Sequence, residues 1–176
     1  MGHYAEGLLT GPVPRILPRI RRTRRGRFQL RLPAAERALL RQLAEELREL
    51  LGTEDPALAR LFPPGYASDP ESDRQYREMV RGDLTAERLA GLQILERTLD
   101  STSLDEEEIG AWLNSVNDMR LVLGTRLDVT DEMNEQGVPP GDERAPRFDV
   151  YRYLTWLEWQ LVDVMATGLP QAGNEA

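Results

Sequence analysis

The chain has 176 residues and a formal net charge of −8, with 30% charged and 40% hydrophobic residues. This length and apolar content suit one domain with its own core and argue against a chain that is disordered throughout. Because the chain has no cysteine and a single histidine, His3, the sequence excludes disulfides, thiolate metal sites, a cysteine nucleophile, Ser-His-Asp catalysis and multi-histidine metal sites.

Extended apolar segments and catalytic spacings are both missing from the sequence. No run approaches the roughly 18 apolar residues of a membrane span, and the first residues contain no secretory apolar run. We therefore expect a cytoplasmic protein with no membrane contact. Since no pair of ionisable residues has a spacing that predicts complementary catalytic roles, we also expect no enzymatic activity, no cofactor and no metal.

The basic residues are concentrated at the start of the chain. Residues 1–31 hold eight arginines against one acid, Glu6, a net charge of +7, so the remaining residues carry −15. Prolines and arginines without a helix period predict a flexible arginine-rich arm over residues 1–24. This arm is a candidate contact for DNA, and a solvated tail is the alternative. The candidate phosphate contacts are Arg21, Arg22, Arg24 and Arg25.

Residues 26–32 alternate polar and apolar side chains, which predicts one short strand. The side chains expected to face inward are Phe28, Leu30 and Leu32. Pro33 then begins a predicted helix that ends near Leu51, followed by Gly52. Because its leucines recur on one arc and its charges on the other, this helix is amphipathic.

The middle of the chain predicts two further helical segments. Asp55-Pro56 indicates a short helical turn that ends at Leu61. Asp69-Pro70 is typical of a helix start, and the helix should reach about Val80. We expect Gly82 to bend or divide it before a second helical section that ends near Thr98.

A third long helix is predicted from the acidic segment onward. Ser103 and Glu106 have the spacing of a capping box, which predicts the start of this helix. We expect the helix to end at Leu123, because Gly124 follows it. Within it, Arg120 projects into the apolar arc. A buried guanidinium needs a partner, which is either a structural ion pair or an anion or partner peptide. The candidate partner-binding residues here are Asn117, Arg120 and Arg126.

The last segments are a predicted acidic, mobile loop over residues 128–146 and a final helix over 148–167. This helix is apolar almost all round. It is therefore either the central element of a bundle or a helix whose tryptophan side, with Trp156 and Trp159, binds a partner or a second copy. Residues 169–176 are expected to be a disordered tail.

Together these patterns predict a mainly α fold. We expect a single compact helical bundle over residues 25–168, with one short N-terminal strand and the flexible basic arm of residues 1–24.

Four strings of the sequence resemble an actinobacterial domain-of-unknown-function family, the AosR-type regulators of transcription under oxidative stress. The resemblance covers about residues 21–167. Its strings are residues 24–28, 58–63 with Tyr66, 112–127 and 151–157. It implies a small cytoplasmic helical protein without enzymatic activity that acts with the transcription machinery. The thiol switch attributed to that family requires paired cysteines, and this chain has none.

The leading hypothesis is thus a non-enzymatic regulator that contacts a transcription component through protein–protein contacts. Those contacts would be made by the final helix or by residues 117–126, with the arginine arm on DNA. The alternative is an adaptor or structural homodimer with no nucleic-acid role.

Overall fold

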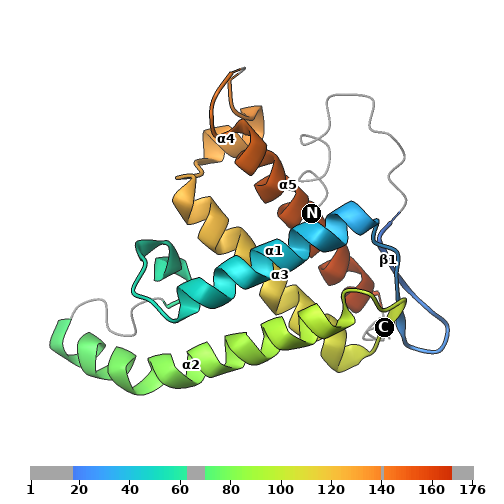
Figure 1. Ribbon diagram of the computed structural model, residues 1–176, viewed down its shortest axis with the longest axis horizontal. Helices are drawn as coiled ribbons and strands as arrows, with labels where there is room; N and C mark the ends of the chain where they lie inside the picture. Colours follow the sequence, from blue (N-terminus) through green and yellow to red (C-terminus); the bar gives the residue numbers. More distant parts are fainter. Residues whose placement is uncertain (1–17, 63–69, 140, 168–176) are drawn as a thin grey trace, which may run out of the picture.

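A computed structural model describes residues 18–62, 70–139 and 141–167 (Figure 1). It confirms the mainly α fold. The elements are β1 (Ile20–Arg22), β2 (Phe28–Leu30), α1 (Ala34–Leu51), the 3-10 helix η1 (Pro56–Arg60), α2 (Pro70–Thr98), β3 (Ser103–Leu104), α3 (Glu106–Arg126), α4 (Asp131–Gln136) and α5 (Ala145–Ala166). No helix in these ranges is both long and apolar enough to cross a membrane.

The helix α3 is the central element, because it packs against α1, α2, α5 and η1. Its Trp112 is fully buried, and the indole Nε1 donates a hydrogen bond to Thr98 Oγ1 at 2.7 Å. The leucines predicted to line one face of α1 do face this core at Leu40 and Leu47. Each such buried side chain stabilises the fold by about 1.5–3 kcal/mol relative to an exposed one.

One edge of the bundle carries a three-stranded antiparallel sheet in the order β1-β2-β3. Ile20 pairs with Leu30, and Gln29 pairs with Ser103. The single predicted strand is therefore joined by two others. A lone strand would leave its backbone groups without partners, and the two neighbours supply them.

The prediction of a flexible arm is wrong for its last residues, since Ile20–Arg22 form β1. Ile20 is only 1% exposed, so one isoleucine within the arginine-rich segment joins the core and holds the strand in place. Residues 1–17 of the predicted arm, and the predicted tail, lie outside the described residues.

Two points in the middle of the chain need comparison with expectation. Of the two outcomes expected at Gly82, a bend or a division, the division is excluded, because α2 runs continuously from Pro70 to Thr98 (Figure 1). One glycine costs only about 1 kcal/mol in a long helix. The capping box is formed by Asp105 and Glu108, each accepting the other's backbone N–H at 2.9 Å. Ser103 lies in β3 instead.

The end of α3 and the following loop also differ from expectation. Gly124 lies inside α3, and its missing side chain leaves room for the ring of Tyr151. A Cβ at this position would lie 3.1 Å from Tyr151 Cε2. Within the predicted loop, Thr130 caps the short helix α4. Its Met133 is buried, so this part of the segment is packed against the body.

Candidate functional site

The helix α5 has one buried side and one exposed side. Trp159 is 60% exposed and Val162 is 48% exposed, and they are the exposed large hydrophobic residues of the described chain. Residues three apart share a helix face, so the two form one patch. Trp156 is only half-buried and lies under the guanidinium of Arg19, 5.7 Å from the ring centroid. The two predicted tryptophans therefore have different surroundings.

Arg19 connects the first strand to two helices. Its Nη2 lies 2.6 Å from Glu36 Oε1 on α1, and its backbone N–H donates to Gln160 Oε1 on α5 at 2.7 Å. Tyr153 on α5 donates its hydroxyl to Glu36 Oε2 at 3.1 Å. Burial and the charge of Glu36 raise the pKa of Tyr153 well above its ordinary value.

We call this group the Arg19 junction; its members are Arg19, Glu36, Tyr153, Trp156 and Gln160. It holds the start of β1 against α1 and α5. The sequence reasoning did not find it, since its partners are as much as 141 positions apart and no local pattern marks them.

The predicted contact residues Asn117 and Arg120 lie together on α3, both partly buried, and Arg120 pairs with Glu158 of α5. Arg120 Nε is 2.5 Å from Glu158 Oε2, and Arg120 Nη2 donates to Asn117 Oδ1 at 3.0 Å. This geometry matches the structural ion pair, one of the two interpretations of the buried guanidinium. Arg126 lies elsewhere, at the end of α3, 3.5 Å from Asp55 Oδ2.

A second ion pair, absent from the predictions, ties α2 to α3. Arg88 Nη1 lies 2.6 Å from Asp118 Oδ2, and Arg88 Nη2 donates to the carbonyl of Leu61 at 2.8 Å. Burial raises the pKa of Asp118, while the positive charge of Arg88 opposes that shift. The signal in the sequence that could have predicted this pair is Asp118, a charged residue within the apolar string of α3.

The predicted phosphate contacts lie on and around the turn between β1 and β2. Arg21, Arg24 and Arg25 are exposed, and Arg22 covers the ring of Phe28 at 5.4 Å. The turn is closed by two hydrogen bonds, Thr23 N–H to the carbonyl of Arg27 at 2.7 Å and Gly26 N–H to the carbonyl of Thr23 at 3.1 Å. Gly26 has a φ of +76°, which suits glycine.

The described residues show no cluster that could bind a metal ion. No group of three or more His, Asp or Glu side chains among them is placed to hold a metal ion. The close charged contacts described above join arginines to carboxylates across elements, which is an arrangement that holds helices together.

Comparisons with known proteins agree on a family. The model of a domain of unknown function, DUF2017, matches residues 18–165. The "Oxidative stress regulator AosR" of Mycobacterium tuberculosis H37Rv is 28% identical over 89% of this chain and 90% of its own length. An AosR-named protein of Mycobacterium leprae is 33% identical over 65% of this chain and 60% of its own length. No solved structure matches significantly.

Proposed function

This chain belongs to the DUF2017 family, and on that premise we propose that it is a non-enzymatic cytoplasmic regulator of the oxidative stress response. It acts through a protein–protein contact with a component of the transcription machinery. The relatives named as oxidative stress regulators match most of the chain, which supports the regulatory role.

The observation that carries this proposal is the exposed pair Trp159 and Val162 on α5. Burying a tryptophan contributes a large share of binding energy at protein interfaces. Since Trp159 leaves 60% of its surface in water while the other two tryptophans are buried or half-buried, this position is the strongest candidate anchor in the described chain.

This chain cannot sense oxidants through thiol chemistry, because it has no cysteine. Among the described methionines, Met119 and Met133 are buried, at 3% and 8% exposed, and Met165 is partly buried, and burial slows oxidation of a methionine sulfur. We propose that the sensor lies in a partner and that this protein transmits the signal by binding.

The test is affinity purification of the tagged full chain from its native host, with and without peroxide, followed by mass spectrometry. We expect a transcription component with the wild-type chain and at least a tenfold loss of it with Trp159→Ala. Glu45→Ala, an exposed change on α1, is the matched control and should retain the partner. Recovery of no transcription component, with unchanged transcripts in a deletion strain under peroxide, would reject the proposal.

The same exposed pair favours a second candidate, a structural homodimer. In a twofold dimer the patch would pack against its own copy and bury both tryptophans. Light scattering during size-exclusion chromatography distinguishes the two. A wild-type dimer that Trp159→Ala converts to a monomer supports the homodimer, and a wild-type monomer excludes it.

A further inference from the structure

The β1–β2 hairpin concentrates positive charge without neutralising it. No acidic residue occurs between residues 18 and 35. Within the part of the chain that the structure describes, none of six arginines on or beside this hairpin forms an ion pair with a carboxylate. They are Arg21, Arg22, Arg24, Arg25, Arg27 and Arg31. Elsewhere, arginines such as Arg37, Arg88 and Arg144 do form ion pairs.

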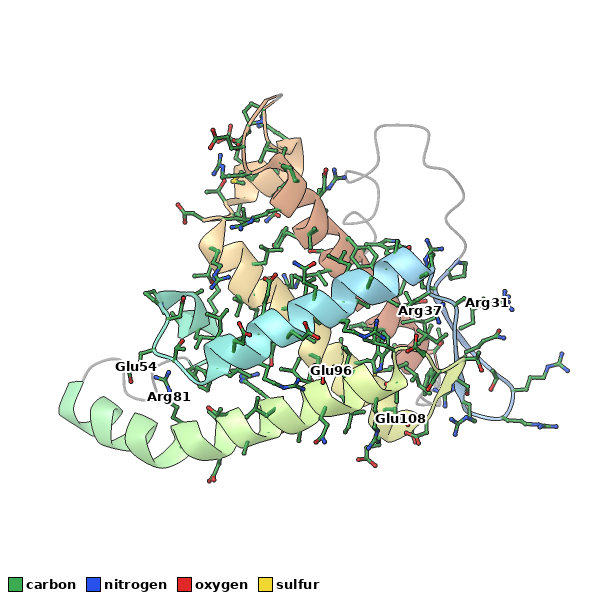
Figure 2. The ribbon with its side chains drawn as sticks, viewed as in Figure 1. Arg31, Arg37, Glu54, Arg81, Glu96 and Glu108 are labelled. Atoms are coloured by element: carbon green, nitrogen blue, oxygen red, sulfur yellow. The ribbon has the colours of Figure 1, made fainter. Side chains whose placement is uncertain are left out.

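The strand geometry places three of these arginines on one outward surface, whereas Arg22 pairs with the buried Phe28 on the opposite face. Ile20, Phe28 and Leu30 are buried, so the intervening positions point outward. The outward side chains of the sheet are Arg21, Arg27, Gln29 and Arg31. Figure 1 shows the hairpin projecting beyond the end of α1, and Figure 2 shows Arg31 at the outer edge of the molecule.

The tip of the hairpin is held in a defined shape. Thr23 Oγ1 donates to the carbonyl of Arg27 at 2.9 Å, in addition to the backbone bonds that close the turn. Arg24 and Arg25 therefore project from an ordered turn. Below it, Arg27 Nε donates to Ser103 Oγ at 2.8 Å and joins the outward face to β3. Like charges held this close repel one another, and an anionic partner would relieve that cost.

We propose that this arginine hairpin is a binding surface for the phosphate backbone of double-stranded DNA. A two-stranded antiparallel ribbon fits the DNA major groove, which is about 12 Å wide. Arginine offers several donors in a planar fork that suits phosphate oxygens. This surface is separate from the Trp159 patch and does not depend on the partner proposed for it.

The charge of the neighbouring elements sets the side from which DNA approaches. The exposed acids Glu106 and Glu107 begin α3 directly after β3, at one edge of the sheet. They repel phosphates there, so DNA contacts the β1 edge and the tip, where Arg21, Arg24 and Arg25 lie. The acidic remainder of the chain confines binding to this surface.

The experiment measures fluorescence anisotropy of a labelled 20-base-pair duplex with the full chain at several salt concentrations. Each phosphate contact contributes about 0.9 to the slope of log K against log salt. We expect Arg24→Gln with Arg25→Gln to reduce the slope by about 1.8 and to weaken binding at 100 mM salt by about tenfold or more. Circular dichroism checks that the double variant folds.

The matched control is Arg60→Gln with Arg147→Gln, which removes the same charge from exposed arginines on η1 and α5. We expect this control to retain the wild-type slope, and Trp159→Ala to retain it as well. The proposal is wrong if duplex DNA does not bind at 50 mM salt, or if both double variants weaken binding equally. It is also wrong if polyglutamate binds more tightly than DNA, because the surface then fits an acidic protein.

Discussion

Arg88 places one guanidinium nitrogen, Nη1, against both carboxylate oxygens of Asp118, at 2.7 and 2.6 Å. The Asp118 side chain is 7% exposed and that of Arg88 is 23% exposed, so the pair lies mostly out of water between α2 and α3. Because the same arginine also holds the carbonyl of Leu61, its removal affects three elements at once.

We expect Arg88→Met to lower the free energy of unfolding by about 2 kcal/mol at pH 7, because a buried carboxylate loses its cation. The pKa of Asp118 is already above its ordinary 3.8 and should rise further without Arg88. Above the ordinary pKa of 3.8 the folded state then binds more protons than the unfolded state. Stability therefore falls as the pH rises through the raised pKa of Asp118.

Urea unfolding at several pH values measures this slope. The matched control is Arg88→Met combined with Asp118→Asn, which has no carboxylate to titrate at this position. If both proteins show the same dependence on pH, the buried Asp118 is not its source.

Glu36 should control the attachment of β1. Glu36→Ala removes a carboxylate that both Arg19 and Tyr153 contact, and we expect a loss of about 2 kcal/mol of stability because the hydrogen bonds are made to a charged group. Hydrogen exchange of the β1 amides should accelerate more than that of the α3 amides. Glu45→Ala, on the exposed side of α1, should change neither quantity.

The same substitution should lower the pKa of Tyr153. The negative charge of Glu36 raises that pKa, and so does its hydrogen bond from the tyrosine hydroxyl. Without Glu36 the pKa should move toward the ordinary value of 10.0, although burial still raises it. Spectrophotometric titration of tyrosine ionisation near 295 nm measures the change; an unchanged curve would contradict the role assigned to Glu36.

Two glycines of α3 should respond in opposite directions to alanine. A Cβ at Gly110 meets nothing within 4 Å, so Gly110→Ala should stabilise the protein by about 0.5–1 kcal/mol. At Gly124 the new methyl group would lie 3.1 Å from a buried tyrosine that stacks on Phe148, so Gly124→Ala should destabilise it by about 1 kcal/mol. Thermal unfolding of both variants provides the comparison, and a gain at Gly124 would contradict it.

The start of α3 distinguishes two adjacent candidate caps. Asp105→Ala should cost about 1 kcal/mol, because Asp105 Oδ1 accepts the Glu108 N–H. Ser103→Ala should cost less than about 0.5 kcal/mol, since that side chain makes only an exposed contact with Arg27. If chemical unfolding shows a larger loss of stability for Ser103→Ala than for Asp105→Ala, then Ser103 caps the helix, as the sequence predicted.

Several elements follow from local sequence. The leucine period of α1, the cap of η1 by Asp55 and the apolar content of α5 each depend on residues within a few positions of one another. Such patterns indicate helices because side chains three or four apart share a face. The resemblance of residues 112–127 and 151–157 to a known family was likewise local information, and the family comparison confirmed it.

The remaining features required the assembled chain. Ile20 becomes part of a strand only because Leu30 pairs with it, and Arg19 acquires Glu36, Trp156 and Gln160 from helices distant in sequence. Periodicity tells which residues of a helix share a face, but the neighbouring elements decide which face they cover. Packing of this kind left Trp159 in water, covered Trp156 with an arginine and filled the space above Gly124 with a tyrosine ring.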